Sequence, residues 1–361
     1  MHTSLSTSLP AVAAFPHAQA QGSIGSVMAK VMLALAPSTL CGLWFFGGPA
    51  ISLWLITIFA AVLGEALCLR LMDKPVRATL LDGSAVLTGW LLALSLPPWA
   101  PWWIGVVGGL FATIIGKQVF GGVGQNLFNP AMVARVALLV SFPVQMTAWV
   151  APALSGHAPG LAESLHITFG GGAIPDAMTS ASLLGQAKTE LSRGVDLLHT
   201  FANGLPTSFS GVRPGSLGET AVLLIAAGGV AMLLMGIISW HIPVSMLAAI
   251  AIPALIAHGI NPARYLDAGA HLLSGGAMLG AFFIATDYVS SPSSRAGQLV
   301  FGAGCGFLTW VIRSYGGYPE GVAFAVLLMN ALTPAIDRLV KPRVYGRDYQ
   351  GRPIVLDKKE S

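Results

Sequence analysis

Long apolar runs fill most of this 361-residue chain, and glycine, proline or charged residues separate them. A helix needs about 20 apolar residues to cross a hydrocarbon core about 30 Å thick. The pattern therefore predicts ten membrane-spanning helices, at about 28–46, 49–69, 79–96, 101–120, 129–147, 219–238, 242–259, 271–287, 297–314 and 319–340.

A long polar interval divides these spans into five before it and five after it. We predict an N-terminal tail, a first five-helix half, a loop region, a second five-helix half and a basic C-terminal tail. Their ranges are 1–27, 28–148, 149–218, 219–340 and 341–361.

Composition points to a membrane protein. Charged residues make up 9% of the chain and hydrophobic residues 54%, whereas soluble domains are roughly 25% charged. In lipid, every backbone polar group needs a partner within the protein, so only helices and closed barrels cross a membrane. The runs are too long and too uniformly apolar for the alternating strands of a barrel. We therefore predict an all-α integral membrane protein.

Several kinds of chemistry lack a signature in this sequence. Cys41, Cys68 and Cys305 lie in apolar segments without CxxC spacing, which argues against a disulfide or a zinc or iron–sulfur site. No HExxH, GxSxG or Walker motif occurs. The first 25 residues lack the basic region of a signal peptide, which favours a cytoplasmic tail. We expect no metal site, no catalytic residue and no complete active site within this chain alone.

Lysine and arginine residues in the short connections predict the orientation. If the spans alternate, these basic residues fall on one side of the membrane, which is then cytoplasmic together with both termini. They are Arg70, Lys74, Arg77, Lys117, Arg295 and the basic residues of the tail. The loop region then faces outward. We interpret the tail as an anchor at the inner face of the lipid bilayer and not as a nucleic-acid site.

The two halves resemble each other weakly. Residues 83–92 parallel residues 274–283, and residues 120–122 parallel residues 315–317. Because each half contains an odd number of spans, the two halves would be inverted relative to each other, as in many transporters. A solute channel or permease is therefore an alternative interpretation, and chance similarity of short glycine-rich stretches is another.

Polar groups inside or at the ends of spans are costly in lipid, which makes them the first functional candidates. The segment 117–130 is rich in glycine, asparagine and glutamine. Its Asn126 and Asn129 could line a cavity on an ion path, or the segment could be a plain re-entrant turn.

Two carboxylates are further ion-path candidates. Glu65 lies within the second predicted span and Asp287 ends the eighth. Either could serve an ion path, or could pair near the surface with Arg70 or Arg295.

The chain re-enters the membrane through a glycine-rich segment, 211–220. Ser216 is followed three residues later by Glu219, which is the spacing of a capping box. A glycine-rich helix start that includes Gly215 is equally a natural phosphate site. Both interpretations stay open on the sequence.

The loop region also contains a cluster of hydroxyl residues. Thr179, Ser180 and Ser182 are potential N-caps of the helix predicted to follow, at about 183–199. A covalent phosphoester would instead need an exposed hydroxyl, a small neighbour such as Ala181, and an acid such as Asp176 for the attaching enzyme to recognise. Residue types alone favour the cap.

Five strings carry a family resemblance: 121–131, 141–147, 240–245, 271–287 and 312–325. Through them, the chain beyond its first 25 residues resembles the NqrB/RnfD family. Members of this family are membrane subunits of the Rnf electron-transport complex and of the sodium-pumping NADH:quinone reductase.

The resemblance implies an FMN phosphoester on a hydroxyl residue in a motif of the form Asp-x-x-Ser/Thr-x-Ala-Thr. Matching Asp176 and Ala181 to this motif places the acceptor at Ser182 and the earlier hydroxyl at Thr179. Serine here replaces the usual acceptor threonine, and Ser180 stands where glycine is common.

The resemblance also implies a multisubunit complex of the bacterial inner membrane. That complex passes electrons between ferredoxin and NAD while it moves Na⁺ or H⁺, and a second FMN-bearing subunit is exposed on the outer face. A flavin transferase would attach the FMN. We further expect the re-entry segment, with Gly215, Ser216 and Glu219, to supply other contacts to the flavin. A second, non-covalent flavin such as riboflavin is implied within the membrane part, without assigned residues.

Overall fold

A computed structural model describes residues 23–152, 159–170, 179–197 and 214–340. Regular structure in these ranges is helical, apart from one antiparallel ladder of two residues per strand. In this ladder β1 (Trp149–Val150) pairs with β2 (Thr179–Ser180). The tail predicted at 341–361 lies outside the described ranges.

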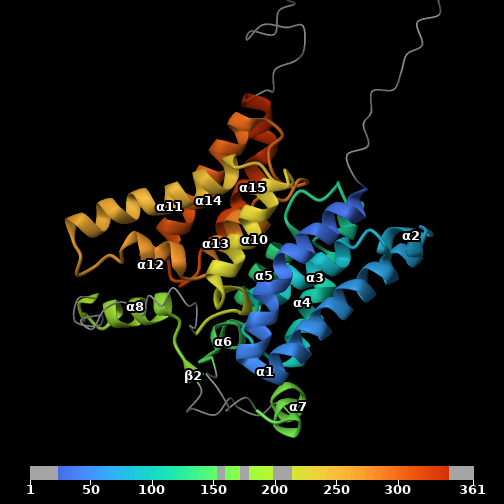
Figure 1. The fold of residues 1–361 in the computed structure, drawn as a ribbon, viewed down its shortest axis with the longest axis horizontal. Coiled ribbons are helices and arrows are strands. Elements are labelled where there is room, and N and C mark those ends of the chain that lie inside the picture. Colours follow the sequence, from blue (N-terminus) through green and yellow to red (C-terminus); the bar gives the residue numbers. More distant parts are fainter. Residues whose placement is uncertain (1–22, 153–158, 171–178, 198–213, 341–361) are drawn as a thin grey trace, which may run out of the picture.

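The first two predicted spans form one helical hairpin. α1 (Ile24–Leu71) has two helical arms, because Gly47 interrupts it with φ 69° and ψ −154°, a conformation that glycine adopts without steric cost. In Figure 1 the blue chain descends along the first arm and returns toward α2 (Val76–Leu80) along the second. Helix α1 begins at Ile24, so the predicted N-terminal tail is too long by four residues.

Within the described ranges, four helices are long and apolar enough to cross a membrane: α1, the stretch Trp102–Phe120, α11 (His241–Ile260) and α15 (Val322–Leu339). Three shorter apolar helices accompany them, α3 (Ser84–Ser95), α5 (Pro130–Ser141) and α10 (Val222–Leu234). Helix α14 (Arg295–Tyr315) packs against α11. The fold is that of a multi-pass, all-α membrane protein.

Several predicted spans are interrupted near their ends. The stretch Trp102–Phe120 comprises α4 (Trp102–Ile114) and the short η1 (Gln118–Phe120). Proline follows Phe142, where the backbone leaves the helical region between α5 and α6 (Pro143–Thr147). The short η3 (Leu217–Glu219) precedes α10.

The eighth predicted span is not one continuous helix. It consists of α12 (Ala268–Leu273), α13 (Ala277–Leu279) and the π-helical η4 (Gly280–Ile284). Between α12 and α13, Ser274 is extended and Gly275 has φ 65°. The prediction of a single helix over 271–287 is therefore wrong, and we call this segment the broken span.

Glycines allow the helices of each half to approach closely. An added Cβ on Gly109 would lie 2.7 Å from the Thr57 carbonyl oxygen. In the second half, an added Cβ on Gly306 would lie 2.2 Å from the Met246 carbonyl oxygen. These contacts join α4 to α1 and α14 to α11.

The two ends of the helix bundle differ. Figure 1 shows α7 (Leu161–Phe169), α8 (Leu183–Ser192) and β2 in the lower part, whereas α1 begins and α15 ends in the upper part. We call these the loop end and the tail end. Helix α8 packs on the second half through Leu183, Leu184 and Ala187, which contact Leu266 and Ala270.

Candidate functional site

Ser182 caps helix α8. Its hydroxyl oxygen accepts a hydrogen bond from the backbone N–H of Gly185 at 3.2 Å. The predicted helix cap is thus confirmed, although α8 ends at Ser192 and not near residue 199. Thr179 belongs to β2, Ala181 is exposed and Asp176 lies outside the described residues.

Ser182 is only 8% exposed, and it lies between two spaces. On one side, a cavity of about 10 Å³ brings Ser182 together with Glu219 of the re-entry segment and Gly275 of the broken span. On the other side, Ser182 borders an open hollow with Trp149 and Pro319. The re-entry segment therefore lies beside Ser182, as expected for residues that share one site.

The predicted capping box at Ser216 does not form. Ser216 makes no side-chain cap bond to the three-residue η3, and its hydroxyl donates to Glu219 Oε1 at 2.7 Å. A Cβ on Gly215 would lie 2.5 Å from Glu219 Oε2. A carboxyl group therefore lies where the sequence suggested a phosphate site.

A buried charged cluster surrounds the loop end of the broken span. Its central residue is Arg313, which is 4% exposed. Arg313 donates to the carbonyl oxygens of His271 at 2.5 Å and Ser274 at 3.0 Å, and it pairs with Glu320. Glu320 also accepts from the N–H of Gly276 at 3.1 Å. The arginine and its acid thereby stabilise the backbone where the helix is interrupted.

Glu219 and Arg135 complete this cluster. Electrostatic interactions link Glu219 with Glu320, Arg135 and Arg313, and Arg135 donates to the carbonyl oxygen of Ser95. Among the described residues, Nδ1 of His271 and Nε of Arg313 have no hydrogen-bond partner. We call Arg135, Glu219, His271, Arg313 and Glu320 the loop-end centre.

A second buried cluster lies at the tail end. Glu65 is fully buried and accepts from Lys117 Nζ and from Gln118 Nε2, both at 2.8 Å. Lys117 also donates to the Ser84 hydroxyl at 2.7 Å. The suggested pairing of Glu65 with Arg70 is therefore wrong. We call Glu65, Ser84, Lys117 and Gln118 the tail-end centre.

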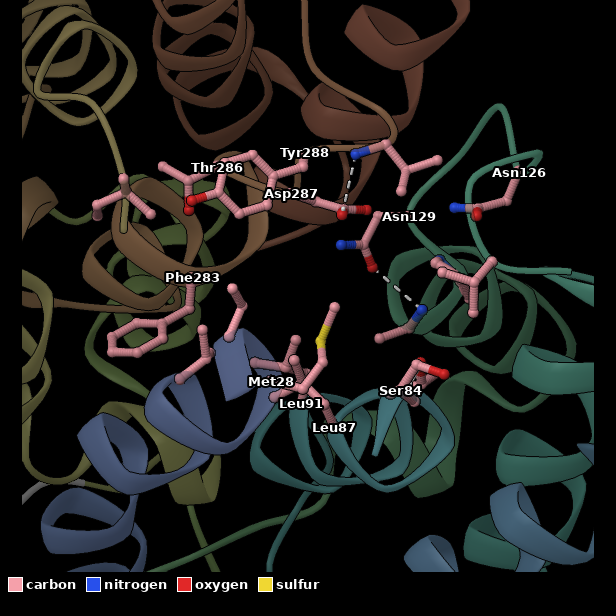
Figure 2. Close-up of a pocket in the computed structure, with 18 of the residues that line it drawn as sticks. Met28, Ser84, Leu87, Leu91, Asn126, Asn129, Phe283, Thr286, Asp287 and Tyr288 are labelled. Carbon is pink, nitrogen blue, oxygen red and sulfur yellow. Dashed lines mark hydrogen bonds between the residues drawn. The ribbon is translucent and has the colours of Figure 1, made fainter. Parts of the chain in front are cut away.

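A cavity of about 100 Å³ adjoins the tail-end centre. Figure 2 shows Ser84, Asn126, Asn129 and Asp287 around it, together with the apolar side chains of α1 and α3. Lys117 also lines this cavity and connects it with Glu65. The structure thus brings three of the four ion-path candidates to one cavity and links the fourth through an ion pair.

Asn129 joins three elements at this cavity. Its side chain caps α5 by accepting from the N–H groups of Ala131 at 3.1 Å and Met132 at 3.3 Å. Its amide nitrogen donates to the Ile284 carbonyl oxygen at 3.4 Å, and its backbone N–H donates to Asn330 Oδ1 at 3.2 Å. Asn129 therefore ties α5 to the broken span and to α15.

The other two cavity candidates are held locally. Asn126 donates to the Phe128 carbonyl oxygen at 3.0 Å. Asp287 accepts from the Val289 N–H at 3.3 Å and from the Ser290 hydroxyl at 3.0 Å. Within the described ranges Asp287 forms no ion pair, so its suggested pairing with Arg295 is wrong.

Sequence reasoning did not identify Arg313 and Glu320 as a pair. The only signal lies within one string, 312–325, where the two residues flank a Gly-Gly turn. The sequence indicates Lys117 only as an orientation signal and as the first residue of the segment 117–130, and nothing in it places Lys117 beside Glu65, 52 positions away.

A lysine on α8 binds the end of α14. Lys188 Nζ donates to the carbonyl oxygens of Ile312 at 3.2 Å, Gly316 and Tyr318. Burial, and to a lesser extent the charge of Arg313, lower the pKa of Lys188 to about 8.

Comparison with known proteins places this fold in a family. The sequence profile of the NQR2, RnfD, RnfE family matches residues 11–346. The chain belongs to the NQR2, RnfD, RnfE family. It shares 52% identity over 352 residues with the D subunit of an ion-translocating oxidoreductase complex from Halorhodospira halophila, and the match covers 95% of this chain and 98% of the relative.

Two further members of the NQR2, RnfD, RnfE family carry the same name. The protein from Stutzerimonas stutzeri is 54% identical over 343 residues, covering 94% of this chain and 96% of its own length. The protein from Rhodobacter capsulatus is 47% identical over 300 residues, covering 82% and 84%. The chain therefore spans nearly the full length of the first two relatives and most of the third.

Proposed function

We propose that this chain is the D-type membrane subunit of an ion-translocating ferredoxin:NAD oxidoreductase complex of the bacterial inner membrane. It carries FMN as a phosphoester on Ser182 and passes electrons in a process coupled to the movement of Na⁺ or H⁺. Near full-length similarity to proteins named as the D subunit of an ion-translocating oxidoreductase complex supports the role. The position of Ser182 at the start of α8 supports the attachment.

The surroundings of Ser182 fit a flavin phosphoester. The first N–H groups of an α-helix and its dipole favour a negative charge at the N-terminus, and α8 has ten residues. The open hollow beside Ser182 contains Trp149 and Pro319, which offer apolar surface to a ring system. When bound, FMN would supply the electron-transfer chemistry, while the protein would supply position and electrostatics.

We propose the tail-end cavity as part of the ion path. Its oxygen-bearing residues Asn126, Asn129 and Asp287 are the ligand types that hard cations prefer. At about 100 Å³, it is smaller than the roughly 150 Å³ that holds one benzene ring. The expected second flavin, which has three fused rings, would not fit there without an opening of the cavity.

We propose that the loop end faces the outside of the cell. The basic residues Lys74, Arg77 and Arg295 then lie on the cytoplasmic side, in agreement with the positive-inside rule. Ser182 is 8% exposed and is not the freely exposed hydroxyl expected of an attachment site, so a flavin transferase would have to reach it through the open hollow beside Trp149 and Pro319. It would lie near the extracytoplasmic FMN subunit of the complex. Ferredoxin and NAD would react at other subunits.

Substitutions at Ser182 can separate attachment from helix capping. Ser182→Asp retains an N-cap acceptor but lacks the hydroxyl that forms the ester, whereas Ser182→Thr retains both. The chain is co-expressed with a flavin transferase and run on a denaturing gel. We expect covalent flavin fluorescence in the wild type and Ser182→Thr, and none in Ser182→Ala or Ser182→Asp.

Full fluorescence in Ser182→Asp would show that the attachment site is elsewhere. If substitution of Thr179, and not of Ser182, abolished the fluorescence, covalent attachment would stand and only the assigned residue would change. If the chain carried no covalent flavin and, without other subunits, conducted a solute in liposomes, the result would support the channel or permease interpretation.

A further inference from the structure

We propose that Lys188 is a positioning residue that fixes the flavin-bearing helix α8 to the α14–α15 connection, and thereby holds the flavin of Ser182 beside the broken span. This inference rests on the proposed function only for the flavin itself. The attachment of α8 to α14 rests on the contacts of the described residues.

The contacts of Lys188 converge on one turn of the chain. Its ammonium group donates to Ile312, Gly316 and Tyr318, which lie at and just beyond the end of α14. The Ile312 carbonyl oxygen also accepts from the Gly316 N–H at 2.9 Å, so Lys188 is a second donor to it. The carbonyl groups of Gly316 and Tyr318 lie just beyond α14, and with them Lys188 uses all three of its N–H donors. One side chain of α8 thus binds three carbonyl groups at the start of the α14–α15 connection.

This turn is the one that organises the loop-end centre. Arg313, the neighbour of Ile312, holds the carbonyl oxygens of His271 and Ser274, and Glu320 follows Tyr318 by two residues. Lys188 therefore connects α8 to this turn, and Arg313, which lies beside the turn, connects the broken span to it. Displacement of the turn would move both α8 and the broken span.

Within α8 itself, the remaining described contacts with the second half are apolar and lack direction. Among the described residues, backbone hydrogen bonds to other segments occur only in the residues that flank α8, in the β1–β2 ladder before the helix and from the Leu197 N–H to the Ala263 carbonyl oxygen at 2.8 Å after it. Leu183, Leu184 and Ala187 pack against Leu266 and Ala270, and apolar packing alone allows a helix to slide or rotate more readily than directed hydrogen bonds do. Because Ser182 is the cap of this helix, its position follows that of α8. Lys188 supplies directed bonds that fix it.

The charge state of Lys188 gives the attachment a dependence on pH. Its pKa is lowered to about 8 while α8 is attached and returns toward the ordinary value of about 10.4 when α8 detaches. The attached state therefore loses its proton more easily, and the attachment becomes more stable as the pH rises above about 8. Charged groups on the surrounding elements include Arg313 of α14 and, around the adjacent hollow, Asp196 after α8 and Arg264 after α11. Arginine at position 188 would remain charged over this whole range.

Hydrogen exchange on the full chain in detergent tests this inference. We compare the amides of α8 in the wild type, Lys188→Met, Lys188→Arg and the control Arg193→Gln, an exposed residue of the same segment. At pH 7 we expect exchange at least about tenfold faster in Lys188→Met than in the wild type, the change expected from loss of one charge-assisted hydrogen bond. Lys188→Arg and Arg193→Gln should match the wild type.

The pH dependence uses Lys188→Arg as its internal reference, which cancels the intrinsic effect of pH on exchange. Between pH 7 and 9.5, exchange at α8 in the wild type should become slower relative to Lys188→Arg, with the change beginning near pH 8. Equal exchange in the wild type and Lys188→Met at pH 7 would overturn the inference. If Lys188→Met did not fold, a wild type that matched Lys188→Arg at every pH would overturn it.

Flavin anisotropy on the same proteins tests the second half of the inference. Lys188→Met should retain covalent fluorescence on a gel but show lower anisotropy of the bound flavin at pH 7. Unchanged anisotropy with faster α8 exchange would refute the positioning of the flavin. Absence of flavin from the wild type would refute the proposed function together with this half, whereas the exchange measurement would still decide the attachment of α8.

Discussion

The loop-end and tail-end centres both bury charge in apolar surroundings, but they use it differently. At the tail end, Glu65 and Lys117 form a direct ion pair. A cavity lies beside this pair. At the loop end, Arg313 divides its donors between Glu320 and the carbonyl oxygens of the broken span. One centre borders an open space, whereas the other stabilises irregular backbone.

This difference matches the chemistry of the two cations. Lysine is a compact point charge that pairs with one carboxylate and one hydroxyl, whereas the planar fork of arginine suits several acceptors at fixed angles. Irregular backbone at membrane depth is tolerated only where protein or water satisfies it. The broken span connects the two regions, since His271 belongs to the loop-end centre and Asp287 lines the cavity beside the tail-end centre.

The largest expected effect is on ion movement at the tail end. Asp287→Asn replaces an anionic acceptor with a neutral amide that also donates hydrogen bonds. In the whole complex reconstituted into vesicles, we expect coupled ion transport to be abolished while covalent flavin is retained. Asp337→Asn, at a half-buried position where the carboxylate accepts from the Ser293 N–H, is the control. Unchanged transport in Asp287→Asn would remove this residue from the ion path.

The buried ion pair should give the largest change in stability. Lys117→Met leaves Glu65 buried without its cation, which costs about 3–5 kcal/mol when a buried pair loses one partner. Thermal unfolding in detergent measures the loss. The double variant Glu65→Gln with Lys117→Met should recover much of it, and additive losses would contradict a direct pairing.

The loop-end centre should require arginine, and not lysine, at position 313. Arg313→Lys keeps the charge but cannot reach His271, Ser274 and Glu320 together, so we expect a loss of about 2 kcal/mol. Hydrogen exchange should increase first over 268–276. Equal protection in the variant and the wild type would show that charge alone is sufficient there.

The smallest expected effect is at the cap of α5. Asn129→Ala removes the acceptor for the N–H groups of Ala131 and Met132, which costs about 1 kcal/mol. Asn129→Ser should restore most of this stability, because serine also caps well. If Asn129→Ala lost much more than about 1 kcal/mol of the free energy of unfolding, the bonds of Asn129 to Ile284 and Asn330 would contribute more to stability than the cap does.

Apolar periodicity was sufficient to predict the membrane class and the approximate position of the helices. The interruption at Ser274 and Gly275 could not be predicted in this way, because residues 271–287 are as apolar as a continuous span. Its partner Arg313 lies about 40 positions away and only the folded chain brings it close.

The candidate sites were predictable to different extents. The N-cap at Ser182 follows from local residue types, and Asn126, Asn129 and Asp287 follow from the cost of polar groups in lipid. Their convergence on one cavity depends on the packing of α1, α3 and the broken span. Local spacing misled at Ser216, where the short η3 leaves the hydroxyl free to bond the Glu219 side chain.

Fragment-ion mass spectrometry of the purified wild-type chain, matured with a flavin transferase, tests the central proposal most directly. We predict that the peptide containing residues 179–188 carries one FMN phosphoester and that the fragment ions assign it to Ser182. An unmodified Ser182 in a chain that carries covalent flavin elsewhere, or a fully matured complex without flavin on this peptide, would contradict the proposal.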